Sequence, residues 1–545
     1  MADDAATQTT PAAATRVEGV GLCAFLDDLG AAHPWLGWLA RRWRAMGLPA
    51  CTWQPRNAWL RVLDASLPVF LGVFLLGLLF NLVEPFGLDN ASKVQSQRIT
   101  ARVLAPFYRS EAQDHVAVVM IDDHTLDARG VGWPPQYAYY DELLRRILAQ
   151  RPRAVYLDIL MQQRRDYDDS YEDARLGIAE EIAAAGIPVY FGVAAPGGRS
   201  IFSGAGGARD VVTSWQGAGN DYPLGIHGQY VNAHGAAMRT DMEGTTGADV
   251  RSVALALYDA ACATGADAGC AAPASALSAQ ARAQPMAVQW GSTLPRGGKA
   301  PVACTRSGEA GFGTRFMASL RLLKDSFNSG RDGQVEDRNR EQCAYAFTVF
   351  EEQLDDEALH DVLADRVVLV GTHLTGLNDR VLSPVHQQIP GVYLHAMALD
   401  NLMKWGEERA HRTDGVNNRL ALLNAVLLSL VAGMVLLAVR GTLKRMLSMA
   451  VLSVVVGLGL AVFAQAVLRQ PPQDWIGLLG LALAVTYYVV NLGQQRPDRQ
   501  EQEDGQGESE SARSVGAAGG ADGRDDSVGV DRNAAAEGAG DPGHQ

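Results

Sequence analysis

Hydrophobic residues gather in four long runs that are unevenly spaced along the chain. One run, 67–83, precedes a long and mostly polar stretch, and the runs 420–439, 446–468 and 475–492 then follow closely. A helix of ~20 apolar residues crosses the ~30 Å hydrocarbon core of a bilayer. We therefore predict four membrane-spanning helices, at 62–84, 419–440, 446–468 and 474–493.

Basic residues indicate the orientation of these helices. Several arginines precede the first run, and Arg440, Lys444 and Arg445 lie between the second and the third. An excess of Lys and Arg marks the cytoplasmic side of a membrane. We therefore expect a bacterial inner-membrane protein with both termini in the cytoplasm. Residues 1–61 then form a cytoplasmic arm, and residues 86–416 form a periplasmic domain.

The C-terminal tail, 494–545, differs from the rest of the chain in composition. It is rich in Gly, Ala and Ser, has no aromatic residue, and carries twelve acidic residues against five Arg. Such a composition cannot form a core and predicts disorder. The tail contributes half of the net charge of −14. The acidic balance argues against nucleic-acid binding, which needs a basic surface. Since no catalytic module follows the last span, we expect a separate protein to receive any signal.

Four of the six cysteines fall in the expected periplasmic domain, where disulfides persist. They are Cys262, Cys270, Cys304 and Cys343. Three pairings are open to them. We favour Cys262 with Cys270 and Cys304 with Cys343, and buried free thiols are the alternative.

Within the domain, aliphatic runs alternate with helical patterns. We predict strands at 116–122, 154–160, 189–193 and 367–370, and helices at 139–149, 171–185 and 392–405. Near-continuous aliphatic runs are typical of strands buried on both faces, and their alternation with helices predicts parallel pairing. The predicted fold class is therefore α/β, with a mostly parallel sheet between one N-terminal and three C-terminal membrane helices. Gly371 is expected to make the turn after the last strand. The middle section, 197–345, indicates only possible strands at 287–290 and 345–349.

Carboxylates lie at or just after the carboxyl ends of the predicted strands, the edge where open α/β sheets bind ligands. They are Asp122, Asp123, Asp158 and Asp379. These side chains could hold a divalent cation or bind the amines and hydroxyls of a ligand, or they could cap the following helices. His395, in the last predicted helix, and Trp133, in a Trp-Pro-Pro loop, are further candidates, with simple packing as the alternative for each. No spacing of His and Cys indicates zinc, and we expect no cofactor.

Several short motifs occur together in one order. They are 118–123 followed by 132–134, then 153–160, 367–371 with 377–379, 383–385, and 390–392 with 395–401. This combination resembles the CHASE2 domain, the extracellular sensory domain of bacterial signalling receptors, and the three trailing membrane helices look like that family as well. The resemblance covers roughly 65–495. Two departures stand out: Pro135-Gln136-Tyr137 replaces a stretch that is usually basic in the family, and the usual cytoplasmic output domain is missing.

The resemblance implies a sensor and not an enzyme. We expect an unknown small-molecule or envelope ligand to change the domain, and the signal to pass to a separate partner. A homodimer is consistent with such a receptor, and Gly433, Gly457 and Gly459 offer small-residue helix contacts. Two alternatives remain open: a membrane-anchored periplasmic hydrolase that depends on carboxylates or a cation, and a scaffold subunit of an envelope complex.

Overall fold

The computed structural model covers the domain and the apolar helices. It describes residues 57–83, 88–195, 197–213, 221–226, 229–231, 237–239, 250–263, 269–292, 311–328, 345–359, 361–377, 379–411, 414–472 and 474–492, together with residues 25, 26, 29 and 33 near the N-terminus.

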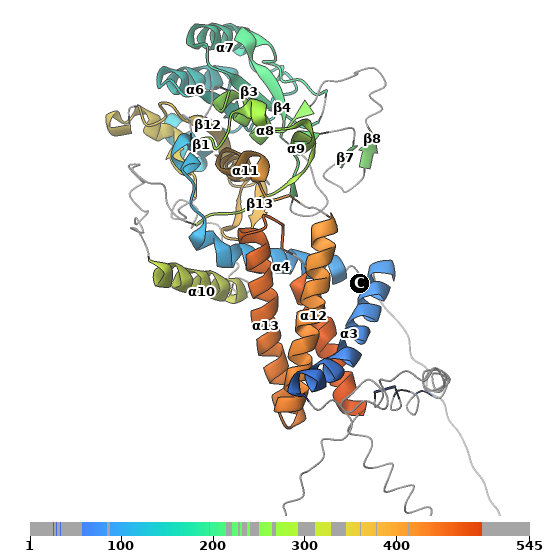
Figure 1. Ribbon diagram of the computed structural model, residues 1–545. Coiled ribbons are helices and arrows are strands. Elements are labelled where there is room, and N and C mark those ends of the chain that lie inside the picture. Colours follow the sequence, from blue (N-terminus) through green and yellow to red (C-terminus); the bar gives the residue numbers. More distant parts are fainter. Residues whose placement is uncertain are drawn as a thin grey trace, which may run out of the picture.

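A six-stranded sheet forms the centre of the domain (Figure 1). In spatial order its strands are β4 (Arg209–Val212), β3 (Val189–Val193), β2 (Ala154–Leu157), β12 (Val367–His373), β1 (Val116–Asp122) and β11 (Phe347–Phe350). Every neighbouring pair is parallel. The prediction of an α/β fold with a mostly parallel sheet is confirmed.

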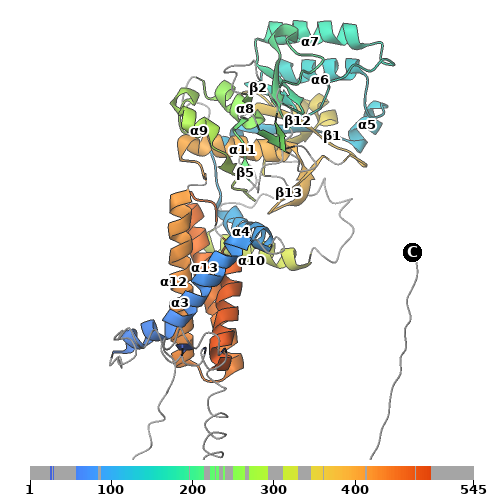
Figure 2. The ribbon, with the colours of Figure 1, turned by 90° about the vertical axis from the view of Figure 1, so that its right-hand side faces the viewer.

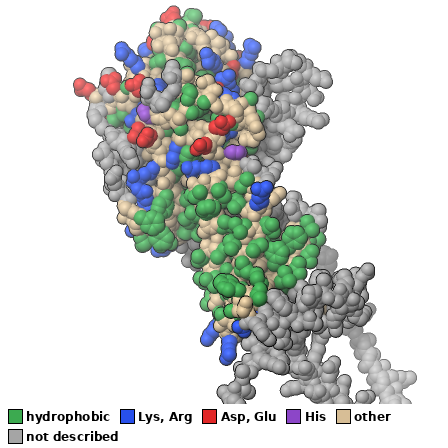
Figure 3. All heavy atoms as spheres, viewed as in Figure 1, with side chains coloured by type: hydrophobic (Ala, Val, Ile, Leu, Met, Phe, Trp, Pro, Cys, Tyr) green, Lys and Arg blue, Asp and Glu red, His purple; other side chains and the backbone are tan. Residues whose placement is uncertain are grey.

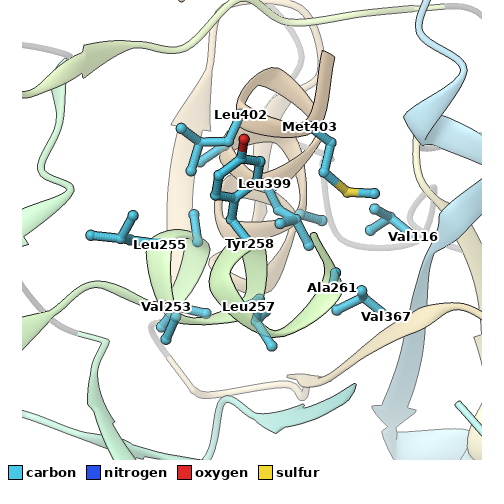
Figure 4. Close-up of a cluster of buried hydrophobic side chains, with 14 of the residues drawn as sticks. Val116, Val253, Leu255, Leu257, Tyr258, Ala261, Val367, Leu399, Leu402 and Met403 are labelled. Atoms are coloured by element: carbon cyan, nitrogen blue, oxygen red, sulfur yellow. The ribbon is translucent and has the colours of Figure 1, made fainter. Parts of the chain in front are cut away.

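Helices cover both faces of the sheet. On one face lie α6 (Tyr137–Ala149) and α7 (Tyr171–Ala185), and on the other lie α8 (Val253–Ala261) and α11 (Val392–Trp405). Successive residues of β1 enter different cores, because side chains alternate across a strand: Val118 packs on the α8–α11 side and Val119 on the α6–α7 side. Figure 4 shows the first of these cores, where Leu402 of α11 meets Tyr258 of α8. A strand buried on both faces has to be apolar throughout, which explains the continuous aliphatic runs in the sequence.

The ends of two strands differ from the prediction. The paired part of β2 stops at Leu157, whereas β12 runs three residues past Val370, to His373. Gly371 therefore lies inside a strand, and the expectation that it makes a turn is wrong. A Cβ at Gly371 would lie 2.5 Å from Cγ1 of Val392, so glycine is needed here for the start of α11 to pack directly on the sheet.

Short elements fill the middle section. Paired strands are β5 (Asp221–Tyr222) with β10 (Met286–Ala287), β6 (Gly225–Ile226) with β9 (Val250–Arg251), β7 (Gln229–Val231) with β8 (Ala237–Arg239), and, later in the chain, β13 (Arg380–Ser383) with β14 (Gln387–Pro390). The remaining α-helices of the domain are α5 (Asp123–Arg129), α9 (Ala279–Ala283) and α10 (Phe312–Asn328). The 3-10 helices are η4 (Ala105–Phe107), η5 (Ala112–His115), η6 (Ala205–Gly207), η8 (Ala274–Ala276), η9 (Glu351–Asp355), η10 (Glu357–Leu359) and η11 (Gly406–Glu408).

A disulfide between Cys262 and Cys270 joins the end of α8 to the following loop. The other expected pair, Cys304 and Cys343, lies outside the described residues.

Four helices in the described part of the chain are long and apolar enough to cross a membrane. They are α3 (Ala58–Val83), α12 (Asp414–Ala438), α13 (Thr442–Ala466) and the helix Trp475–Leu492. They form a bundle beneath the domain (Figures 1 and 2). Figure 3 shows hydrophobic side chains over the surface of this bundle and basic side chains at the end away from the domain. Both α3 and α12 begin a turn or so before the predicted spans, because a helix continues beyond its apolar part. Pro68 consequently lies inside α3.

Glycines bring some of these helices close together within one chain. A Cβ at Gly433 of α12 would lie 2.6 Å from the carbonyl oxygen of Val62 in α3, and one at Gly457 would lie 3.2 Å from Trp475. Gly459 has nothing within 4 Å. Two of the three glycines that we singled out are thus used in contacts inside the bundle.

Helix α4 (Leu88–Leu104) connects the bundle to the domain, lying across the upper end of the bundle in Figure 1. Ser92 and Ser96 donate hydrogen bonds to the Asp474 carboxylate, over 2.6 and 3.2 Å, directly before the last apolar helix. From α4 the chain continues through the short helices η4 and η5 into β1, so α4 is the one α-helix between the first apolar helix and the sheet in the described residues.

Candidate functional site

Asp158 follows β2 at the carboxyl edge of the sheet, and its side chain is only 7 % exposed. Its Oδ1 atom accepts a hydrogen bond from the Tyr156 hydroxyl over 2.6 Å and another from the Thr213 hydroxyl over 2.5 Å. Tyr156 is the last but one residue of β2, and Thr213 directly follows β4. Two strands thus hold one carboxylate in a defined position.

His395, in the first turns of α11, faces this carboxylate. Its Nε2 atom lies 3.9 Å from Asp158 Oδ2 and 3.2 Å from Thr213 Oγ1. Its Nδ1 atom lies 2.9 Å from the Tyr222 hydroxyl. The imidazole is almost fully buried, and burial lowers its pKa, although the Asp158 charge acts in the opposite direction. His395 is therefore an uncharged imidazole at neutral pH.

The hydrogen bonds favour one tautomer of His395. The Tyr222 oxygen already accepts a hydrogen bond from the backbone N–H of Ala254 over 3.1 Å, so its own proton is available for Nδ1. The histidine proton then belongs on Nε2, directed at Thr213 and Asp158. A chain of donors thus runs from the backbone through Tyr222, His395 and Thr213 to Asp158.

Asp379 brings a second carboxylate to this edge from the loop between β12 and β13. Burial, and then the charge of Asp158, raise the pKa of Asp379 above the ordinary value of a carboxyl group. Asp379 is exposed as a residue, so solvent screens part of the repulsion between the two carboxylates. Its Oδ1 atom is close to the backbone, since a Cβ at Gly391 would lie 2.7 Å from it. Gly391 directly precedes α11, so Asp379 lies over the start of the helix that carries His395.

Asp122 and Asp123 lie at the same edge but hold the backbone. Asp122 Oδ1 accepts from the Thr125 backbone N–H over 2.8 Å, which caps α5. Asp123 Oδ2 accepts from the backbone N–H and the hydroxyl of Thr375, over 2.9 and 2.7 Å, and so ties α5 to the loop after β12. Trp133 packs half-buried against the core on the α6–α7 side. Of the six predicted residues, the structure gathers three: Asp158, Asp379 and His395.

Asp122 also belongs to the group of potential metal ligands found among the described residues. One ligand atom each from Asp122, His124 and Glu352 lies within 4.8 Å of the others. Carboxylate and imidazole ligands suit a divalent cation. However, the Thr125 hydroxyl lies within hydrogen-bond distance of both Asp122 and Glu352 and donates its one proton to one of them, so part of their acceptor capacity is already used.

A second polar cluster lies at the other end of α11 and was not predicted. Buried Asp400 accepts hydrogen bonds from the Tyr108 hydroxyl, over 2.5 Å, and from the Tyr345 hydroxyl, over 3.3 Å. Burial raises the pKa of Asp400 to about 6, and burial lowers the pKa of Lys404 to about 8. Lys404 lies 4.0 Å from the centre of the Tyr108 ring.

This cluster reaches the membrane bundle through Trp405. The Trp405 ring lies 4.7 Å from Lys404 Nζ and 4.6 Å from the Arg469 guanidinium. Arg469 belongs to the loop between α13 and the last apolar helix. Helix α11 therefore carries His395 near its start and contacts a loop of the bundle at its end.

The sequence offered no signal for Thr213 and Tyr222, which come from the section without clear periodicity. Asp400 stands in the motif that also contains His395, but its partners Tyr108 and Tyr345 are 292 and 55 residues away. Only proximity in the fold identifies these residues.

The site lies inside a domain that comparison with known proteins identifies. The CHASE2 domain matches residues 66–437, from within α3 to the end of α12. No curated protein and no solved structure is similar to the chain. The matched segment contains all the site residues described above except Arg469, and it covers well over half of the sequence. The chain therefore belongs to the CHASE2 domain family, a family of extracytoplasmic sensor domains.

Proposed function

We propose that this membrane protein senses a small ligand at the carboxyl edge of its sheet, through Asp158, Asp379 and His395. The observation that carries the proposal is the Asp158 carboxylate, which Tyr156 and Thr213 hold beside the buried and uncharged imidazole of His395, with Asp379 at the same edge. Perturbed titratable groups that gather at such an edge are typical of functional sites. We propose sensing and not catalysis as the role of this site.

The charge of the site defines the class of ligand. His395 is neutral, so the group has no cation of its own to balance its two carboxyl groups. A solute with a cationic group or strong hydrogen-bond donors would bind these carboxyl groups and favour the ionised form of Asp379. Asp158 and His395 are already fixed by the hydroxyls of Thr213 and Tyr222, so little side-chain entropy is lost on binding.

Helix α11 is the route that we propose for the signal. His395 and Lys404 are nine positions apart on this helix, about 14 Å along its axis. A ligand that favours one position of the start of α11 would bias the contact of Trp405 with Arg469 at its end. Only η11 and a short segment separate α11 from α12, the second apolar helix.

We further propose that the domain is periplasmic, in the inner membrane of a Gram-negative cell, with both termini in the cytoplasm. Arg440, Lys444 and Arg445 support this orientation, because they lie at the turn between α12 and α13, on the side away from the domain. A phosphatase that folds only outside the cytoplasm should be active when fused after residue 300 and inactive when fused after residue 440. The reverse result would contradict the orientation.

A separate cytoplasmic or membrane protein is the proposed receiver of the signal. After the last described helix, the sequence continues with an acidic stretch that is rich in Gly and Ala and offers no core. The receptor would act as a homodimer, in which two bundles move relative to each other.

Thermal unfolding of the full-length protein in detergent tests the site. The probes are divalent cations, amino acids and polyamines, each measured against the wild type and the variants Asp158→Asn, Asp379→Asn and Asp122→Asn. A ligand that binds the folded state raises the melting temperature. We expect a rise for one class of cationic solute that is lost in Asp158→Asn and Asp379→Asn but kept in Asp122→Asn, because an Asn at position 122 still caps α5.

The same variants show whether the ligand binds at this site or at another one. A response that persists unchanged in Asp158→Asn and Asp379→Asn would mean that the ligand binds elsewhere. Hydrogen exchange completes the test: the ligand should change protection at the end of α11 and the start of α12 in the wild type and not in Asp158→Asn. Unchanged protection in the wild type would contradict α11 as the route.

A further inference from the structure

Helix α10 exposes a row of large apolar side chains. Phe312 is 74 % exposed, Phe316 48 %, Met317 51 % and Leu320 44 %. Phe312, Phe316 and Leu320 are each four residues apart, and Met317 precedes Leu320 by three, so the four share one broad face of the helix. Among the described residues outside the four apolar helices, the other exposed large hydrophobic side chains are fewer on each element: Leu160 and Tyr167 in the loop before α7, Leu176 on α7, Leu382 on β13, and Val467 and Leu468 directly after α13. Within the domain, exposed large apolar side chains are therefore concentrated on α10.

The opposite side of α10 is fixed to α4 and the domain. Ser319 is buried and donates a hydrogen bond to the carbonyl oxygen of Val103, over 2.8 Å, near the end of α4. Leu322 packs against the small core around Ala105, and Phe312, at the edge of the exposed face, has its ring 5.5 Å from the ring of Phe107. These contacts hold the helix in place and turn its apolar face outward.

Helix α10 lies at the level of the upper ends of the apolar helices. Its support, α4, binds through Ser92 and Ser96 to Asp474, directly before the last apolar helix begins at Trp475. Figures 1 and 2 both place α10 beside α4, level with the upper ends of the apolar helices. In Figure 3, hydrophobic side chains gather at this height beside the apolar surface of the bundle.

The charges of α10 favour lipid over a protein partner. The helix carries Arg315, Arg321 and Lys324 against a single acid, Asp325. Basic residues beside an apolar face are typical of helices that lie in a membrane interface, with their cations near anionic headgroups. We propose that α10 lies in the membrane surface on the domain side of the bundle. Its four exposed apolar side chains would enter the acyl boundary, and its basic side chains would meet anionic lipid headgroups.

This contact would connect the membrane surface directly to the domain. Because α10 is bonded to α4, the lipid surface would act on the helix that joins α3 to β1, independently of the ligand site at Asp158. The domain would then be supported at three places: α3, α12 and α10.

Photocrosslinking in the full-length protein tests the proposal. Benzoylphenylalanine replaces Phe316, or Leu320, and the protein is reconstituted in nanodiscs of phosphatidylcholine and phosphatidylglycerol. The matched control is Leu176 on α7, which is 61 % exposed but far from the bundle, and the positive control is Val455 on α13, which is 63 % exposed. Mass spectrometry of the labelled peptide identifies the crosslinked molecule.

We expect lipid adducts at positions 316 and 320 at a level at least about tenfold above position 176, because side chains held in the interface are in continuous contact with acyl chains. Adducts should decrease in discs of phosphatidylcholine alone and in the variant Arg321→Glu with Lys324→Glu. A crosslinked dimer, or no more lipid than at position 176, would overturn the proposal. The adduct at position 455 shows in every sample that the protein is folded in the disc.

Discussion

Asp400 is a carboxyl group that is only 1 % exposed, on α11 between the proposed ligand site and the membrane. The substitution Asp400→Asn keeps its shape and leaves Oδ1 as an acceptor for the Tyr108 hydroxyl. The change removes the charge and puts an amide group in place of Oδ2, a buried atom that accepts no hydrogen bond in the structure. It therefore tests whether a buried negative charge destabilises this junction at neutral pH.

The size of the expected stability change follows from the pKa of Asp400. Burial raises the pKa of Asp400 from the ordinary 3.8 to about 6. The folded protein consequently holds this proton more tightly than the unfolded chain, and stability falls as the pH rises from about 4 to above 6. Once Asp400 is ionised, the difference between its folded and unfolded pKa lowers the free energy of unfolding by about 3 kcal/mol. Lys404 offsets part of this loss of stability, because the Asp400 charge acts to raise the pKa of Lys404 and so favours its protonated form. We expect Asp400→Asn to gain about 1 to 3 kcal/mol at pH 7.5 and almost nothing at pH 4.

The assay is thermal unfolding of both proteins in one detergent, at one scan rate, at several pH values between 4 and 7.5. The melting temperature of Asp400→Asn should exceed that of the wild type by a margin that grows with pH and levels off above about 6.5. In the control variant Glu357→Gln, which changes an exposed carboxylate, the difference in melting temperature from the wild type should not increase with pH. A margin that is independent of pH, or a wild type that is the more stable protein at pH 7.5, would refute the reasoning.

Two further predictions concern the bundle and the disulfide. Gly433→Ala should lower stability by about 1 to 3 kcal/mol, because its Cβ would meet the backbone of α3, whereas Gly459→Ala, which has open space, should have almost no effect. Equal melting temperatures for these two variants would contradict the close packing of α3 and α12. Replacing Cys262 and Cys270 together by Ser should lower stability by about 2.5 kcal/mol, from the loss of a short loop constraint on the unfolded chain. Reductant should destabilise the wild type more than the double variant, and an equal effect on both proteins would contradict a contribution of the Cys262–Cys270 bond.

Some elements could be read directly from the sequence. The strands at 116–122 and 189–193 and the helix at 171–185 have the same ends in the structure as in the prediction. Their patterns are local: a strand between two helix layers is apolar at every position, and a surface helix has a period near 3.6. Helix α10 was not predicted, because it lies in the Gly- and Ala-rich middle section, from which only possible strands were inferred.

The candidate site could be predicted only in part. The rule that ligands bind at the carboxyl edge of a parallel sheet located Asp158 and Asp379. Thr213 and Tyr222 could not be found, because they are 182 and 173 residues away from His395 in a section without a clear pattern. Their role depends on β4 and β5 reaching the same edge as the start of α11.

The sequence alone determined the class of protein: apolar runs of membrane-spanning length, an inserted parallel α/β domain and a set of carboxylates at strand ends. These follow from the local pattern of polar and apolar residues. The tertiary structure alone decided which carboxylate meets His395. Asp122 and Asp158 each stand where a buried strand ends, yet one caps a helix and the other faces an imidazole. The difference lies in the neighbours: α5 begins directly after Asp122, whereas Asp158 is placed beside Thr213 and opposite α11 by strands that are far apart in the sequence.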